Sequence, residues 1–130
     1  MSSRNKLQAR LDKYDQQRRR LTAQLSDVGF VWHGSVRRQL LTCGTPACRC
    51  HVDPDARHGP YAYWSTKIAG KTVSRLLKAA EAELYEEWIA NRRQIERVVR
   101  DLKTLSAKAA RVIFKLRPPA DTPRKQRRRS

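Results

Sequence analysis

Three cysteines and a histidine are gathered in one segment of this chain, Cys43-Gly-Thr-Pro-Ala-Cys48-Arg-Cys50, which is followed by His58. Structural zinc takes four sulfur or nitrogen ligands at tetrahedral angles, and these often come from closely spaced residues that flank a turn. A glycine and a proline between the first two cysteines favour such a turn. The segment therefore predicts a zinc site in which Cys43, Cys48 and Cys50 supply three of the four ligands.

The fourth ligand has two candidates. His58 stands just before Gly59-Pro60 and an aromatic stretch, so it can fold back onto the thiolates from the far side of a hairpin loop. His51 directly follows Cys50, and ligands that are adjacent in sequence point in divergent directions. We therefore favour His58 as the fourth ligand and keep His51 as the alternative.

The same segment argues against a disulfide and against catalysis. The number of cysteines is odd, and the chain has no apolar leader that would direct it to an oxidising compartment. A catalytic zinc site needs an open position and a nearby general base. The nearest acids, Asp53 and Asp55, are typical of a polar turn, and no His-x-Glu accompanies the cysteines. We expect a structural metal site and no enzymatic activity.

Outward from the cysteines the apolar pattern has a period of two, which is typical of β-strands. Candidate strands cover about residues 36–42, 61–68 and 72–77, with a turn signal at Ala69-Gly70. On the second strand the face expected to be buried carries Ala62, Trp64, Thr66 and Ile68, and the mixed face carries Tyr61, Tyr63, Ser65 and Lys67. The aromatic residues are interpreted as core of the sheet, with stacking on unpaired bases as the functional alternative.

Heptad patterns flank the strands on both sides. Leu7, Tyr14, Leu21 and Val28 repeat every seven residues, and a longer pattern runs from about residue 79 to the prolines at 118 and 119. Such patterns are typical of coiled-coil helices, here roughly 35 Å and 55 Å long. An antiparallel pair leaves about 20 Å of the longer seam uncovered. We therefore expect a homodimer through the long helix.

Together these patterns predict an α+β fold in which long antiparallel coiled-coil helices flank a small three-stranded antiparallel sheet with a zinc-stapled hairpin. The expected organisation is a coiled-coil helix over residues 1–28 and a zinc-binding β-hairpin region over residues 29–78. A long helix follows over residues 79–117, and a Pro-rich linker with a basic tail occupies residues 118–130.

The charge balance is the strongest compositional signal, because 29 Lys and Arg residues face 12 Asp and Glu, a net charge of +17. Nucleic-acid affinity comes largely from neutralising phosphates, so we expect a nucleic-acid partner, with DNA favoured over RNA. The sequence shows neither a bilayer-spanning apolar run nor a signal peptide, so we expect the cytoplasm and no membrane partner. The candidate contact residues flank the hairpin and fill the tail: Arg37, Arg38, Arg49, Arg57, Lys67, Lys71, Arg75, Arg124, Lys125, Arg127, Arg128 and Arg129.

An ordered pattern extends over about residues 34–100. Its members are Gly34-Ser35-Val36, Arg38, Cys43-Gly44, Cys48-Arg49-Cys50, His58-Gly59-Pro60-Tyr61, Tyr63, Ser65, Gly70-Lys71-Thr72 and Ser74-Arg75. This pattern resembles a family of short bacterial proteins of unknown function that is associated with phages, plasmids and transposons. The resemblance implies that the three cysteines and His58 act together, and it suggests a mobile-element context.

Three functions are compatible with these features. The leading hypothesis is a zinc-stabilised DNA-binding accessory factor for a recombinase or transposase. The long heptad favours a second possibility, a protein-interaction adaptor in which the charge serves only for tethering. RNA binding is the third, because basic tails and exposed aromatic residues also suit RNA.

Overall fold

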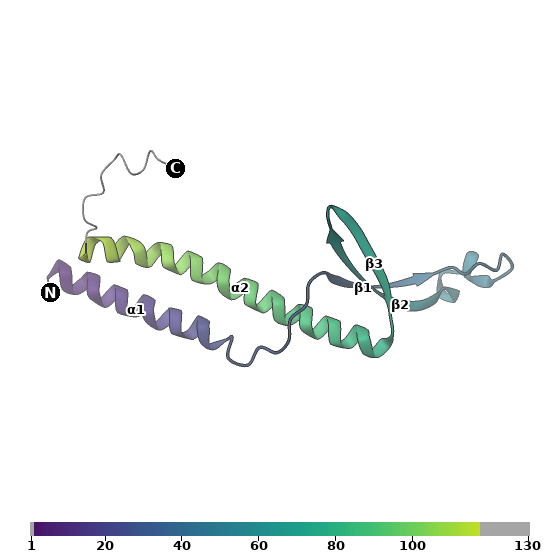
Figure 1. Cartoon of the computed structure of the whole chain (residues 1–130), viewed down its shortest axis with the longest axis horizontal. Helices are drawn as coiled ribbons and strands as arrows, with labels where there is room; N and C mark the ends of the chain where they lie inside the picture. Colours follow the sequence, from purple (N-terminus) through teal and green to yellow (C-terminus); the bar gives the residue numbers. More distant parts are fainter. Residues whose placement is uncertain (1, 118–130) are drawn as a thin grey trace. The chain divides into compact units, whose positions relative to one another are not determined.

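The computed structural model describes residues 2–117, and its elements confirm an α+β fold with two helices and a three-stranded antiparallel sheet (Figure 1). In chain order these are α1 (Ser3–Ala23), β1 (Ser35–Leu41), the short 3-10 helices η1 (Arg49–His51) and η2 (Pro54–Ala56), β2 (His58–Ile68), β3 (Lys71–Leu77) and α2 (Ala79–Leu116). The chain divides into two compact units. The sheet unit holds residues 28–94, and the helical unit combines residues 2–27 with residues 95–117, so α2 contributes to both.

The sheet has the order β1-β2-β3, with β2 in the centre. The central strand is rich in aromatic and β-branched residues, which fit a pleated surface. Ala69 and Gly70 connect β2 to β3, with φ angles of 51° and 80°. A two-residue turn with positive φ at both positions matches the twist of a hairpin, which explains why this dipeptide closes the pair.

One face of the sheet packs on the first half of α2. Ala62 and Trp64 of β2 form a buried cluster with Ala82 and Ile89 of α2, and Trp32 and Tyr85 pack against it. The Trp64 indole N–H donates to the carbonyl of His33 at 2.9 Å, which satisfies its polar atom inside the core. Ile68, expected on this buried face, is 56% exposed because it lies at the β2–β3 turn, beyond the cluster.

The segment that leads into β1 is fastened to α2 by hydrogen bonds. The Asn91 side-chain amide donates to the Phe30 carbonyl at 2.8 Å, and Arg92 donates to the carbonyls of Trp32 and Gly34 at 3.2 and 3.1 Å. Asn91 lies seven residues before Val98 in the heptad pattern of the long helix, at a position where that pattern calls for an apolar residue, and these contacts explain its polar side chain. It satisfies a backbone carbonyl that a hydrophobic residue would leave without a donor.

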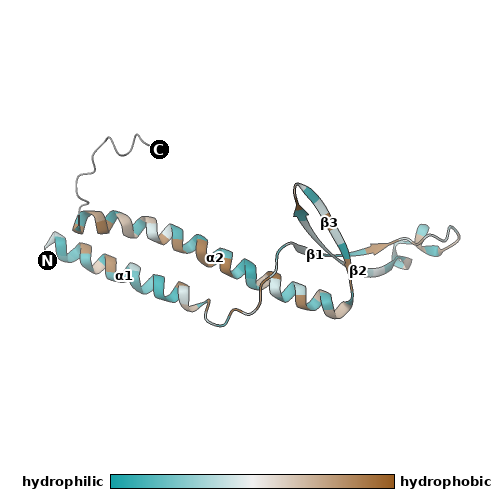
Figure 2. Ribbon diagram, in the orientation of Figure 1, coloured by the Kyte–Doolittle hydropathy of each residue, from teal (hydrophilic) through white to brown (hydrophobic). Residues whose placement is uncertain are grey.

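The helical unit consists of α1 and the second half of α2, which run antiparallel (Figure 1). Arg4 near the start of α1 donates to the carbonyl of Leu116 at the end of α2. Val98, Leu105 and Val112, spaced by seven residues, are buried along α2. No residue of α1 is buried, and Figure 2 shows that this helix is mostly hydrophilic. Coiled-coil packing of the pair stays a prediction.

Candidate functional site

The cysteine segment forms a loop between β1 and β2 that returns the chain onto itself. Antiparallel pairing places Leu41 opposite His58, so Cys43, two residues beyond β1, lies beside the start of β2. Cys48 precedes η1, and the tight turn of that short helix carries Cys50 inward, where it is only 2% exposed. Local backbone geometry therefore gathers residues that are up to 15 positions apart.

The four side chains meet at one point. The sulfur atoms of Cys43, Cys48 and Cys50 and a ring nitrogen of His58 all lie within 4.8 Å of one another. The Cys43 and Cys50 sulfurs are 3.7 Å apart, and the Cys48 sulfur lies 3.5 Å from His58 Nε2. Tetrahedral zinc with ordinary bond lengths separates two sulfurs by about 3.8 Å and a sulfur from a nitrogen by about 3.6 Å. The cluster can hold a metal ion, and these two separations fit zinc.

The electrostatics of the cluster favour the metal-binding form of two thiols. Hydrogen bonding from the Thr45 backbone, assisted by Cys50, Cys48 and His58, lowers the pKa of Cys43 to about 6. The backbone of Cys50 and the ring of His58 lower the pKa of Cys48. Burial raises the pKa of Cys50, and contacts with Cys48 and Cys43 raise that of His58. Because thiolates are the ligands of metals, the site is prepared for a cation.

The surroundings of the cluster suit structural binding. The Cys43 backbone N–H donates to the Cys50 sulfur at 3.3 Å, the kind of contact that orients a metal-bound thiolate. Asp53 accepts the backbone N–H of Asp55 and pairs with Arg49 at 3.0 Å. Within residues 2–117 no carboxylate and no second histidine belongs to the cluster, so His51 lies outside it. All three cysteines are free thiols.

The basic residues expected to contact nucleic acid do not form one surface. Arg38 and Arg75 lie on the face of the sheet that α2 covers, and acidic side chains of α2 neutralise them. Arg38 pairs with Glu86, and Arg75 pairs with Glu81 at 3.4 Å and donates to the Tyr85 hydroxyl at 2.6 Å. The Lys78 backbone N–H, followed by Arg75, lowers the pKa of Glu81 and keeps this partner charged.

The opposite side of the sheet, here called the open face, keeps its cations free. Arg37 is paired with Tyr63 across the strands and Lys67 with Thr72, on the side away from α2. Neither cation has an ion-pair partner within the part of the chain that the structure describes. The residues of the open face are Ser35, Arg37, Gln39, Tyr61, Tyr63, Ser65, Lys67, Thr72, Ser74 and Leu76.

The other basic residues expected to contact nucleic acid lie outside the open face. Arg49 is occupied by Asp53, Arg57 is exposed next to the metal cluster, and Lys71 is exposed at the β2–β3 turn. The tail residues Arg124, Lys125, Arg127, Arg128 and Arg129 lie outside the described residues. The cations of the two helices were not predicted as nucleic-acid contacts, although their spacing by three or four residues along α1 is visible in the sequence.

Comparison with known proteins places the chain in a family. The chain belongs to the family described as "Domain of unknown function (DUF6788)", which matches residues 6–86. The match includes α1 from its first turns, the whole sheet and the metal cluster, and it ends within the first turns of α2. No curated protein and no solved structure matches the chain. Neither α1 nor α2 has the length and apolarity needed to cross a membrane.

Proposed function

We propose that this chain is a non-enzymatic, zinc-stabilised nucleic-acid-binding protein, with duplex DNA as the favoured ligand. The observation that carries the proposal is the open face of the sheet. The sequences of β1, β2 and β3 contain no aspartate or glutamate, so nothing on these strands opposes a phosphate. The cations on the covered face are neutralised internally, whereas Arg37 and Lys67 on the open face are available.

Tyrosines give the open face a second means of recognition. Tyr61 is 40% exposed, and Tyr63 stands between Arg37 and Leu76 in the register of the sheet. Arginine and lysine contact phosphates, and tyrosine rings stack on unpaired bases. A face of this composition therefore suits a duplex through its backbone and a single strand through its bases.

In this proposal zinc cross-links the two ends of the loop that connects β1 to β2. It joins the residue two positions beyond β1 to the first residue of β2 and fixes the loop between them. The two arginines of the loop, Arg49 and Arg57, are balanced by Asp53 and Asp55. Outside the metal site, the side chains of the loop therefore carry no net charge that could attract a nucleic acid. Its contribution is rigidity, because a structural metal site couples binding to local folding.

Adjacent arginines on opposite faces provide the test. Affinity for fluorescent duplex DNA, single-stranded DNA and single-stranded RNA is measured by anisotropy over about 50–200 mM salt. Arg37→Gln removes a cation of the open face, and the logarithmic salt slope should become shallower by about 1, as expected for one lost phosphate contact. Arg38→Gln is the matched control and should leave the slope unchanged. Equal effects of the two variants would contradict an open-face contact, and a preference for RNA would reassign the ligand.

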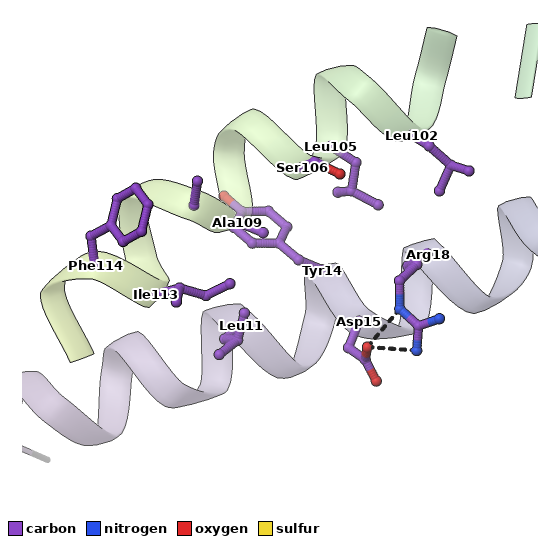
Figure 3. Close-up of a pocket in the computed structure, with 11 residues that line it drawn as sticks. Leu11, Tyr14, Asp15, Arg18, Leu102, Leu105, Ser106, Ala109, Ile113 and Phe114 are labelled. Carbon is purple, nitrogen blue, oxygen red and sulfur yellow. Dashed lines mark hydrogen bonds and ion pairs between the residues drawn. The ribbon is translucent and has the colours of Figure 1, made fainter. Parts of the chain in front are cut away.

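A second candidate function, protein docking, is favoured by one side of the helical unit. The apolar flank of α2 comprises Ile95, Val99, Leu102, Ser106, Ala109 and Ile113, spaced by three or four residues, together with the neighbouring Phe114. Figure 3 shows part of this flank forming a groove with Leu11 and Tyr14 of α1. Phe114 is 56% exposed and Val99 is 41% exposed.

We infer that a second copy of the chain covers the apolar flank. The helical unit is strongly basic, yet large apolar and small residues make up this flank, so two copies can meet there without opposing like charges. Sedimentation equilibrium of the full chain should give a dimer that Phe114→Ser weakens. Phe30→Ser, which changes an exposed phenylalanine of the sheet unit, is the control. A monomeric wild type would leave the flank to a different protein and favour the adaptor function.

A recombinase or transposase partner and a cytoplasmic location stay predictions of the sequence. The family match supports neither of them, because its description names no activity.

A further inference from the structure

The two flanks of the helical unit differ in chemistry. Opposite the apolar flank, Gln17, Arg20 and Leu21 of α1 and Asp101, Thr104, Leu105 and Lys108 of α2 line a second groove. Positions spaced by three or four residues lie on the same side of a helix. The residues that continue this spacing along α1 and α2 therefore extend the walls of the groove in both directions.

Most positions along these walls are basic. The α1 wall runs through residues 6, 10, 13, 17 and 20, and the α2 wall runs through residues 97, 101, 104, 108, 111 and 115. Eight of these positions are basic, and we call them the basic flank: Lys6, Arg10, Lys13, Arg20, Arg97, Lys108, Arg111 and Lys115. All eight are exposed, and the one acid on the walls, Asp101, lies 3.6 Å from Arg100.

The acids of α1 lie away from the basic flank. Asp15 lines the apolar groove and pairs with Arg18 and Arg19, while Asp12 accepts a hydrogen bond from Gln8. None of the eight cations of the basic flank forms an ion pair among residues 2–117. Cations three or four residues apart on a helix repel one another and cost stability, so their alignment calls for a polyanion that neutralises them.

We propose that the groove between α1 and α2 is a second nucleic-acid site, which takes the phosphate backbone of a duplex along the basic flank. The cationic walls extend over roughly 21 Å on α1 and 27 Å on α2. One strand of a duplex presents a phosphate about every 3.4 Å of its axis, so roughly six to eight phosphates lie alongside eight cations. The floor of the groove is narrow and apolar, at Leu21 and Leu105, and offers no hydrogen bonds to bases. The contact is therefore independent of sequence.

The chemistry favours nucleic acid over an anionic membrane. A helix that lies on a lipid surface inserts its large apolar side chains and keeps its cations on the polar face. Here the large apolar side chains lie on the opposite flank, so a membrane that received them would leave the basic flank facing solvent, without an anionic partner. The inference rests on the proposed nucleic-acid function and assigns to that function a surface different from the open face of the sheet.

The test compares two double variants that remove the same charges from the same helices. Arg20→Gln with Lys108→Gln removes two cations that line the groove, and Arg19→Gln with Lys103→Gln removes an arginine and a lysine away from it. Affinity of the full chain for a short duplex is measured from about 50 to 200 mM salt. The groove variant should make the logarithmic salt slope shallower by about 2, since each phosphate contact contributes about 0.9. The control variant should leave the slope unchanged.

Several outcomes would overturn this site. Equal slopes for the wild type and the groove variant, or equal changes in both variants, refute the groove while the proposed nucleic-acid function survives. A wild type that binds no duplex refutes the proposed function and the groove together. Binding to phosphatidylserine vesicles without binding to DNA assigns the cations to a membrane. Unchanged helical circular dichroism in both variants verifies that the comparison concerns folded protein, because exposed cations are replaced by good helix formers.

Discussion

Removal of the histidine from the cysteine cluster should abolish most of the stabilisation that zinc provides. A ligand that binds only the folded state stabilises it by about 2.7 kcal/mol when its free concentration is a hundred times the dissociation constant. His58→Ala leaves three thiols, and a site weakened a hundredfold retains about 0.4 kcal/mol at the same zinc concentration. For a unit the size of residues 28–94, the zinc-dependent rise in Tm then falls from roughly 10–20 °C to about 2–3 °C.

Tryptophan fluorescence is the appropriate assay, because Trp32, Trp64 and Trp88, the chain's three tryptophans, all lie in the sheet unit. Thermal unfolding is followed with and without buffered zinc for the wild type, His58→Ala and His51→Ala. His51 is exposed and lies outside the cluster, so its variant should keep the full zinc response. A wild-type Tm that does not depend on zinc would refute the metal site. A lost response in His51→Ala, with a normal response in His58→Ala, would refute the choice of ligand.

Three further predictions concern the sheet unit. Gly34 has φ of 81°, and a Cβ there would overlap the Ser65 carbonyl and lie 2.6 Å from Trp64 Nε1, so Gly34→Ala should cost at least about 2 kcal/mol in urea unfolding. A cost below about 0.5 kcal/mol would contradict this packing. Ile89 is 3% exposed, and Ile89→Ala should cost about 2–5 kcal/mol in the same assay; a neutral result would show that the cluster on α2 is not a core. Apparent zinc affinity, followed with a chromophoric chelator, should rise between about pH 7 and 8, by about tenfold for each ligand that must still lose a proton. Burial raises the pKa of Cys50 and contacts with the thiols raise that of His58, so zinc displaces protons from these two ligands, whereas Cys43, with a pKa of about 6, is already ionised. A zinc affinity that does not change over this range would contradict the assignment of these ligands.

The elements that depend on short-range patterns were predictable. The period of two, the Ala69-Gly70 turn and the prolines after residue 117 locate three strands and the end of the long helix, because each signal acts on neighbouring residues. The cysteine cluster was predictable for the same reason, since its ligands flank one loop of the chain. His58 belongs to the cluster because the pairing of β1 with β2 places it opposite Leu41, two residues before Cys43.

The division of the basic residues was not predictable, because it depends on contacts between distant segments. Arg37 and Arg38 are neighbours in sequence, yet only Arg38 meets Glu86, which lies 48 residues further along the chain. In the sequence Asn91 is a polar residue within an apolar heptad pattern. Its role is seen only in the structure, where its side chain donates to the Phe30 carbonyl. The cationic spacing along α1 was visible in the sequence, but its partner wall on α2 required the antiparallel pairing of the helices.

The affinity of the zinc-loaded wild-type chain for a short DNA duplex, measured against salt concentration, tests the central claim most directly. If at least half of the basic flank contacts phosphates, the logarithmic slope should be about −4 or steeper between about 50 and 200 mM salt. An affinity that is undetectable at about 50 mM salt, or that does not change with salt, would contradict a nucleic-acid-binding function.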